Sequence, residues 1–218
     1  MSSPRRCDGN QGFHNMRFAG TLLALAAFVS CSEAPKPATE TKKEAPKALE
    51  PLTGRQAYQQ MYIAARSWAP DCQPLQLASI HLERTKFPTG KAEGWQCVFV
   101  SLGRGRARSY TWATVETQGS LHKGVFAGQE ESYSPNRQLA PFLTSAIKVD
   151  SGEAYDTAMT KSTEFAKKLE GKPVSFRLEQ TPRFPDVAWR IFWGESVSSS
   201  EYTVFVDATT GQFLERIR

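Results

Sequence analysis

The side chains best suited to chemistry in this sequence are those of His81 and Glu83. They lie in the segment 78–83, where apolar and polar residues alternate as in a half-buried strand. Alternate residues of a strand share a face, so the imidazole and the carboxylate are expected side by side. Such a pair could act as an acid and a base in catalysis.

A second segment of the same pattern weakens the catalytic interpretation. In residues 174–179 the positions equivalent to His81 and Glu83 are occupied by Arg177 and Glu179. An arginine cannot replace a histidine as a proton donor and acceptor, whereas both can form polar pairs on a solvated face. We therefore favour surface polar pairs, and we take these four residues as the expected binding face.

Motifs of the common enzyme classes are missing from the sequence. It has three histidines, and it contains no His-x-x-x-His, Glu-x-x-His, Cys-x-x-Cys or Gly-x-Ser-x-Gly pattern and no glycine-rich loop ahead of a Lys-Ser or Lys-Thr pair. We expect no cofactor, no metal and no catalytic residue. A non-catalytic binding or regulatory module ranks first, a structural component of the cell envelope second, and an envelope hydrolase last.

The basic segment 103–108 could contact lipid phosphate or an acidic protein. It also falls where a hairpin turn is expected, and a solvated turn is the favoured interpretation. The formal net charge of the whole chain is +5, which is too small and too dispersed to predict nucleic acid as a partner.

The N-terminal region predicts export. Arg17 is followed by an uncharged, mainly apolar run at 18–29, which is shorter than the ~20 residues that span a membrane as a helix. Phe28-Val-Ser-Cys31 resembles the lipobox of bacterial lipoproteins, and an ordinary secretory signal cut near the alanines is the alternative. The resemblance implies that 1–31 is a signal peptide and that Cys31 carries the lipid anchor.

The resemblance to the lipobox also implies where the protein is located. The protein would be extracytoplasmic and attached to a membrane through its lipid, and Ser32 after the cysteine favours the outer membrane if the source is Gram-negative. Residues 32–52 are rich in Pro, Lys, Glu and Ala and are expected to form a disordered tether.

Two cysteines, Cys72 and Cys97, follow the tether. Extracytoplasmic compartments are oxidising, so a disulfide bridge between them is favoured over two small buried thiols. A simple hairpin that pairs Glu83 with Gly94 would place Cys97 opposite Ile80, and the segment 69–77 would then have to fold back over the strand that starts at Trp95.

The rest of the chain predicts the same element order twice. Capping-box patterns at 53–56 and 150–153 begin two helices, which end at Ala69-Pro70 and Gly171-Lys-Pro173. The strands 78–83 and 174–179 follow, with Ala78, Ile80 and Leu82 expected to face the core in the first. Next come Trp-led strands at 95–99 and 189–193, and hairpins at 110–121 and 202–214.

This repetition predicts an α+β fold of two tandem units, each a helix followed by an antiparallel sheet. Unit 1 spans 53–125 and unit 2 spans 150–218. The connector 126–149 is expected to contain a short docking helix at 141–147. Each unit alone would bury a marginal core, and a pair could share apolar surface.

Val206-Asp-Ala-Thr-Thr-Gly-Gln-Phe-Leu214, together with the opening helix and the Trp-led strand, resembles the PepSY domain family. The second unit is the clearer copy, because the first has Val115 where the motif has Asp. The resemblance implies a PepSY/cystatin-like fold in a secreted or membrane-attached bacterial protein. It also implies a non-catalytic role that includes restraint of peptidases, which makes a peptidase the expected partner.

Overall fold

The computed structural model describes residues 48–82, 90–117, 121–169 and 171–217. Within the compact unit that begins at Ala45, eight strands form one fully antiparallel sheet. The strands of this sheet are β2 (Gln73–Ser79), β4 (Gly94–Ser101), β5 (Arg106–Ala113), β6 (Gly124–Ser132), β7 (Val174–Glu179), β8 (Ala188–Trp193), β9 (Tyr202–Asp207) and β10 (Phe213–Ile217). A two-stranded ribbon is formed by β1 (Leu52–Thr53) and β3 (Lys91–Ala92), and the helices are α1 (Gly54–Trp68), the 3₁₀ turn η1 (Thr144–Ala146), α2 (Ser151–Thr160) and α3 (Thr163–Lys168).

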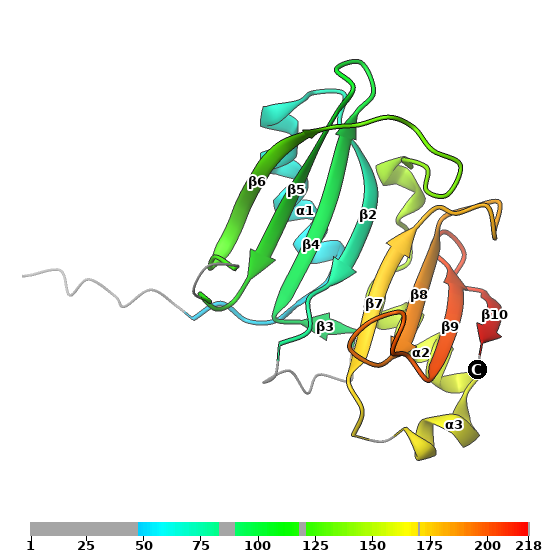
Figure 1. Ribbon diagram of the computed structural model, residues 1–218. Coiled ribbons are helices and arrows are strands. Elements are labelled where there is room, and N and C mark those ends of the chain that lie inside the picture. Colours follow the sequence, from blue (N-terminus) through cyan, green and yellow to red (C-terminus); the bar gives the residue numbers. More distant parts are fainter. Residues whose placement is uncertain (1–47, 83–89, 118–120, 170, 218) are drawn as a thin grey trace, which may run out of the picture. The chain divides into compact units, whose positions relative to one another are not determined.

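The sheet has the α+β character expected from the sequence, and its strand order is symmetrical. The order is β10-β9-β8-β7-β2-β4-β5-β6, so each half is a run of four neighbouring strands that follows its own helix in the chain (Figure 1). The halves are joined where β2 pairs with β7, with Leu77 opposite Leu178. The repeated units are therefore fused through one continuous sheet rather than packed as two separate sheets.

Both long helices pack on the same face of this sheet. From α1, Ala57, Met61 and Ala65 are fully buried against β4 and β5, and α2 contributes Ala154 and Ala158 against β8 and β9. A single hydrophobic cluster contains residues of both helices and of both halves of the sheet. The opposite face of the sheet, toward the viewer in Figure 1, carries no helix over β7 to β9 and is called the helix-free face below.

The first turns of α1 and α2 are in contact, and both capping boxes predicted from the sequence are present. The Asp150 carboxylate accepts hydrogen bonds from the Thr53 hydroxyl at 2.6 Å and from the Arg55 amide at 2.9 Å, in addition to capping its own helix. Ser151 is fully buried, and its Oγ accepts from the Gly54 amide at 2.8 Å and donates to the Gly90 carbonyl. One pair of adjacent residues thus binds both helices and the β3 region together.

Two buried tryptophans repeat the same contact in the two halves. Trp95 Nε1 donates to the Leu52 carbonyl and Trp189 Nε1 donates to the Val149 carbonyl, both at 2.9 Å. A Cβ at Gly54 would lie 2.6 Å from the Trp189 ring and 3.1 Å from the Trp95 ring. The absence of a side chain at Gly54 therefore allows α1 to begin against both indoles.

The C-terminal hairpin has the geometry that its sequence predicts. The Asp207 carboxylate accepts from the amides of Thr209 at 2.8 Å and Thr210 at 2.7 Å, and Gly211 has φ +75°. Both faces of β9 are buried, however, because Phe205 on the helix-free face is covered as well as Val204 on the core face.

The first strand of the first half differs from its prediction. It spans Gln73–Ser79 rather than 78–83, and Leu77 faces the core while Ala78 faces the other side. A register shift between Pro74 and Gln76 and the pairing of β2 with two neighbours fix this earlier position. Because side chains alternate along a strand, the core assignment of Ala78 had the wrong phase. Ile80 and Leu82, also expected in the core, lie beyond the end of the strand and are only partly buried.

Two boundaries also differ from their predictions. The second helix is broken at Ser162, which is buried with φ −129° and forms a hydrogen bond of 3.0 Å with the Tyr202 hydroxyl. The strand β6 continues to Ser132, into the segment predicted as connector. The expected docking helix is the single turn η1, flanked by buried Phe142 and Ile147.

The helix junction generates the first prediction. Ser151→Ala removes the acceptor of the Gly54 amide and the donor to the Gly90 carbonyl at a fully buried site. An unsatisfied buried polar group costs about 1–3 kcal/mol, so the free energy of unfolding should fall by at least that amount in urea titrations. Ser67→Ala, on the exposed side of α1, is the matched control and should leave stability nearly unchanged. Equal stability of the two variants would contradict the role given to the junction.

Candidate functional site

The structure describes three of the four residues of the expected binding face. Arg177 and Glu179 lie on β7 with partly exposed side chains. The His81 side chain is 26% exposed, and its Nε2 lies 3.8 Å from an oxygen of Glu195. Glu83 is outside the described residues, as is Cys31. The described imidazole thus faces a carboxylate from the other half of the molecule.

Arg177 belongs to a row of residues that crosses four strands. Ala78 on β2, Arg177 on β7, Arg190 on β8 and Phe205 on β9 are successive partners in register. The row lies on the helix-free face, because the neighbours of Arg177 on β7, Phe176 and Leu178, are buried in the core. The two guanidinium-bearing residues therefore stand directly opposite each other on adjacent strands.

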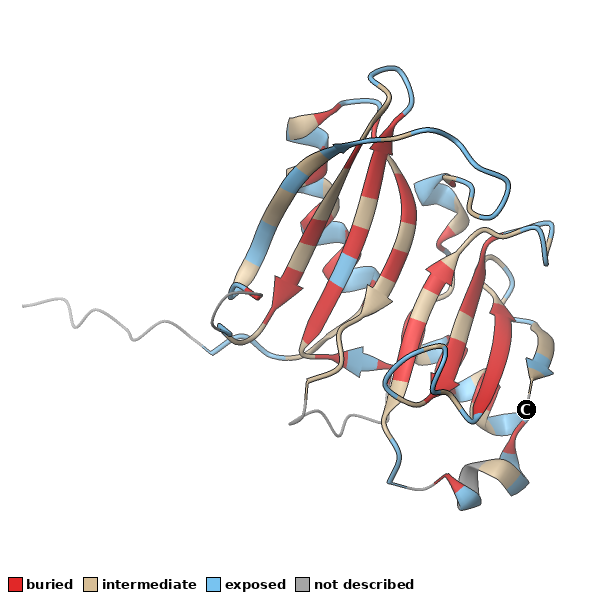
Figure 2. Ribbon diagram, viewed as in Figure 1, coloured by how far each residue is buried: buried red, intermediate tan, exposed pale blue. Residues whose placement is uncertain are grey.

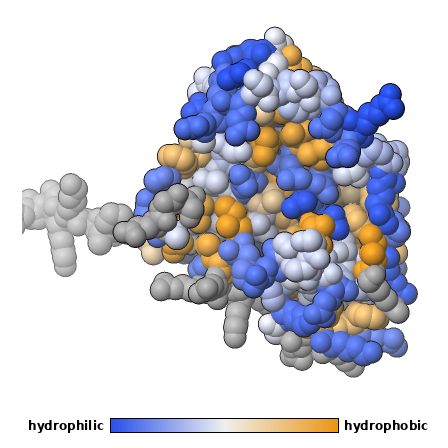
Figure 3. All heavy atoms as spheres, viewed as in Figure 1, coloured by the Kyte–Doolittle hydropathy of each residue, from blue (hydrophilic) through white to orange (hydrophobic). Residues whose placement is uncertain are grey.

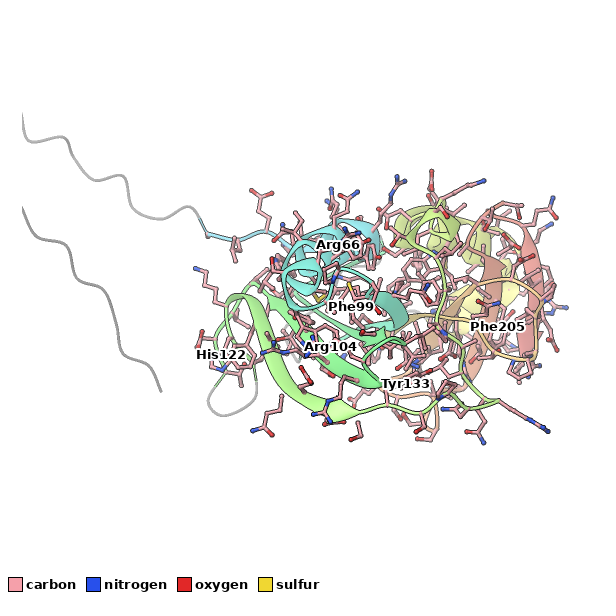
Figure 4. The ribbon with its side chains drawn as sticks, turned by 90° about the horizontal axis from the view of Figure 1, so that it is seen from above. Arg66, Phe99, Arg104, His122, Tyr133 and Phe205 are labelled. Atoms are coloured by element: carbon pink, nitrogen blue, oxygen red, sulfur yellow. The ribbon has the colours of Figure 1, made fainter. Side chains whose placement is uncertain are left out.

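Phe205 holds two of the cationic side chains on this face. The Cζ atoms of Arg183 and Arg190 lie 5.1 and 5.5 Å from the centre of its ring, within the range of a cation–π contact. Phe184 packs against the same ring with a centroid distance of 5.1 Å. We call Arg177, Arg183, Arg190 and Phe205 the arginine face; Figure 4 labels Phe205 on the strands of the second half.

The acidic groups around the arginine face are already engaged. Glu179 accepts a hydrogen bond of 2.7 Å from the Gln76 amide, and Glu215 binds Arg183 through two hydrogen bonds of 2.8 and 2.9 Å. The hydrogen bonds and the charge of Arg183 lower the pKa of Glu215. Arg177 and Arg190 take part in none of the ion pairs formed among the described residues, and the Nε of each is buried without a hydrogen-bond partner.

Burial lowers the pKa of the Arg190 guanidinium. Glu179 opposes this effect, whereas the like charges of Arg177 and Arg183 add to it. An arginine remains protonated under such conditions, so the charge persists in a partly desolvated position. The sequence analysis included Arg177 in the expected binding face but did not include Arg190. A single arginine within the otherwise apolar strand 189–193 could have indicated it.

A hollow of about 490 Å³ adjoins the arginine face. Its lining includes Arg137, Gln180, Thr181, Arg183 and Phe184, which come from the connector and from the loop between β7 and β8. The helix-free face around it shows apolar and hydrophilic side chains intermixed (Figure 3).

The basic segment 103–108 forms the predicted turn and binds its own chain. Glu130 accepts from Arg106 at 2.8 Å, from Arg104 at 3.2 Å and from the Trp68 indole. Arg104 also donates to the Trp68 carbonyl and stacks over its ring. The hydrogen bonds from Trp68 and Arg106, with the charge of Arg104, lower the pKa of Glu130. Arg104 and Arg106, which the sequence suggested as contacts for lipid phosphate or an acidic protein, are therefore bound to groups of their own chain.

The strand β6 is an edge of the sheet and is largely exposed (Figure 2). Val125 and Phe126 are 38% and 43% exposed, and the His122 ring packs on Phe126 with centroids 4.0 Å apart. Among the described strands, β5 is the one that pairs with β6. An edge strand presents unpaired backbone amides and carbonyls along its other side.

The two cysteines after the tether are free, buried thiols in the structure, so the favoured bridge is absent from it. The register explains why: Cys97 pairs with Leu77 rather than Ile80, and Gln73, next to Cys72, pairs with Val100. Three strand residues span roughly 10 Å, beyond the ~7 Å between Cα atoms that a disulfide allows. Burial raises the pKa of both thiols.

The described residues contain no cluster of three or more His, Cys, Asp or Glu side chains placed to hold a metal ion. None of the helices in the described ranges is long and apolar enough to cross a membrane.

Comparisons with known proteins returned one structural neighbour. No family model matches the sequence, and no curated protein matches it. The neighbour is the crystal structure of a candidate lipoprotein from Clostridium difficile 630, with 8% identity and a TM-score of 0.45 over 74% of this chain and 91% of that chain. A likeness of this size supports no inference about the present chain.

The cluster around Glu130 generates a pH-dependent prediction. A carboxylate whose pKa is lowered by folding contributes stability above its unfolded pKa of about 4.3, and this contribution is lost as pH falls through the lower folded pKa. Glu130→Gln should therefore lower the melting temperature at pH 7, and the gap to the wild type should close toward pH 3. Glu131→Gln, the exposed neighbour with the same change in charge, should show no such pH-dependent gap. A gap for Glu130→Gln that is equal at both pH values would contradict this reasoning.

Proposed function

We propose that this protein is a lipid-anchored, extracytoplasmic binding module that takes up an extended peptide segment of a partner protein without catalysing a reaction. The observation that carries the proposal is the β6 edge, with its exposed Val125 and Phe126. A peptide that adds to such an edge gains main-chain hydrogen bonds, and exposed apolar side chains supply specificity.

The anchor in this proposal rests on the sequence around Cys31. An apolar run too short to span a membrane ends in a lipobox-like pattern, and a Pro-, Lys- and Glu-rich segment separates it from the folded unit. Several acyl chains on one cysteine would hold the protein at a membrane stably. The tether would allow the sheet edge to bind a partner near the membrane surface. If the source is Gram-negative, the proposed membrane is the outer membrane.

The PepSY-like hairpin at 206–214 suggests what the partner is. Its Asp207 and Gly211 have the turn geometry that the motif predicts, and PepSY-like units restrain peptidases. A peptidase restrained by this protein is therefore the partner class that we favour.

The anchor is tested by Cys31→Ser in the native host. The wild type should fractionate with membranes, and mass spectrometry of its N-terminal peptide should show an acylated Cys31. The variant should leave the membrane fraction, because the lipid supplies the attachment. A free N-terminus downstream of Cys31 in the wild-type protein would overturn the anchor.

The edge is tested by Phe126→Asp in the anchored, full-length protein. Crosslinking in native envelopes should recover a peptidase whose activity the wild-type protein suppresses. A charge at this aromatic side chain, which the bound peptide would bury, should reduce recovery by about tenfold. Ile63→Asp is the control, because Ile63 is 72% exposed and lies on the helix α1 rather than on the edge strand.

Two outcomes would contradict the proposal. Equal recovery with Phe126→Asp and Ile63→Asp would remove the edge from the interaction. Turnover of a substrate by the purified protein alone, abolished by one side-chain change, would show that the protein is an enzyme.

A further inference from the structure

We propose that Arg177 and Arg190 form a binding site for a carboxylate presented by an acidic peptide segment. The site lies on the helix-free face of the second half of the sheet, whereas the β6 edge terminates the first half. This inference therefore stands on different residues from the proposed function and goes beyond it.

The first observation is an unfavourable arrangement that the fold maintains. Arg177 and Arg190 are paired in register on β7 and β8, and like charges directly opposite each other destabilise a sheet. Residues on central strands cannot move apart as loop residues can. Such a pair is expected where a bound anion offsets the repulsion.

The second observation is unused hydrogen-bonding capacity. The Nε atoms of both side chains are buried and have no hydrogen-bond partner. Removing such a donor from water without a partner is unfavourable. An anion could not reach these buried Nε atoms, but at the terminal nitrogens it would accept hydrogen bonds from both guanidinium groups and offset their charge.

The third observation is that the nearest acidic side chains have other partners. Glu179 accepts from Gln76, Glu215 binds Arg183, and the Asp207 carboxylate caps the turn after β9. The charge of Glu179 does favour the charged form of Arg190. The Glu179 carboxylate nevertheless accepts its hydrogen bond from Gln76 on β2 rather than from an arginine. Arg177 forms no ion pair among the described residues.

The charges favour a carboxylate over a phosphate. Arg177, Arg183 and Arg190 bring three positive charges, and the nearby Glu179, Asp207 and Glu215 bring three negative ones, so the surroundings offer no excess positive charge to balance a doubly charged ligand. A carboxylate carries one negative charge, whereas a phosphate monoester carries nearly two at neutral pH.

The geometry of the same face shows how an arginine there accepts a carboxylate. Arg183 binds Glu215 through Nε and a terminal nitrogen at 2.9 and 2.8 Å, the bidentate arrangement typical of this pair. Phe205 lies beneath the guanidinium groups of both Arg183 and Arg190. Because the Nε of Arg190 is buried, its two terminal nitrogens would make the corresponding contact with a carboxylate.

The test uses an end-blocked octapeptide of glutamate and the matching octapeptide of glutamine, both carrying a fluorophore, with the full-length protein at physiological salt. Fluorescence anisotropy should show that the glutamate peptide binds and the glutamine peptide does not. Arg177→Gln and Arg190→Gln should each weaken binding by about tenfold or more, the effect expected for one charge-assisted contact. Arg66→Gln, an exposed arginine on α1 with the same change in charge, should weaken it less than twofold.

Lysine variants distinguish bidentate hydrogen bonding by arginine from nonspecific electrostatic attraction. Arg177→Lys and Arg190→Lys keep the charge but lose the bidentate geometry, so they should also bind more weakly than the wild type. Melting temperatures are measured for every variant. Arg177→Gln should melt at the same temperature as the wild type or higher, because it removes a repulsion, so weaker binding cannot be assigned to unfolding.

The outcomes that overturn the inference are distinct from those that overturn the proposed function. Equal weakening by Arg66→Gln and Arg177→Gln would indicate only general charge attraction. Binding of inorganic phosphate measured by calorimetry and lost in Arg177→Gln and Arg190→Gln, without binding of the glutamate peptide, would make the ligand a phosphate. Phe126→Asp should leave binding of the glutamate peptide unchanged, because it lies on the other half of the sheet.

Discussion

The fold depends on the contact between the first turns of its two helices. Asp150 caps its own helix and accepts from Thr53 and Arg55, while Ser151 joins α1 to the Gly90 carbonyl. A four-stranded half with one helix buries a marginal core and leaves two sheet edges open. Joining the halves at this point allows β2 to pair with β7, which removes one edge from each half and makes one cluster of the two cores.

This arrangement decides which surfaces are available for function. The helices and the buried tryptophans Trp95 and Trp189 occupy one face, and Arg177 and Arg190 of the second half lie on the other. Arg177 and Arg190 become neighbours only because β7 and β8 pair in the register that also aligns their buried residues. At the far end of the sheet, β6 keeps an open edge. The two proposed binding surfaces are thus consequences of the same symmetrical sheet.

Local patterns in the sequence predicted the local features well. The capping boxes, the Trp-led strands and the Asp207–Gly211 turn are each determined by a few adjacent residues, and all are present. The phase of β2 could not be predicted in the same way, because it depends on a shift near Pro74 and on pairing with β7, which is distant in the chain. The break at Ser162 likewise depends on Tyr202, forty residues away.

The candidate site was predictable only in part for the same reason. Arg177 and Glu179 stood out from the alternation of one strand, but their partners Arg190 and Gln76 come from neighbouring strands whose register the sequence does not reveal. The Cys72–Cys97 bridge was inferred from the oxidising compartment, and the register of β2 against β4 places those residues apart.

The central claim, that the two halves form one cooperative unit through their junction, is tested most directly by native-state hydrogen exchange measured by mass spectrometry. Amides of β4 in the first half and β8 in the second should exchange with the same free energy of opening, equal to that of global unfolding, because neither half is stable alone. Exchange of one half at a clearly lower free energy, while the other remains protected, would show that the halves unfold independently and would contradict the account.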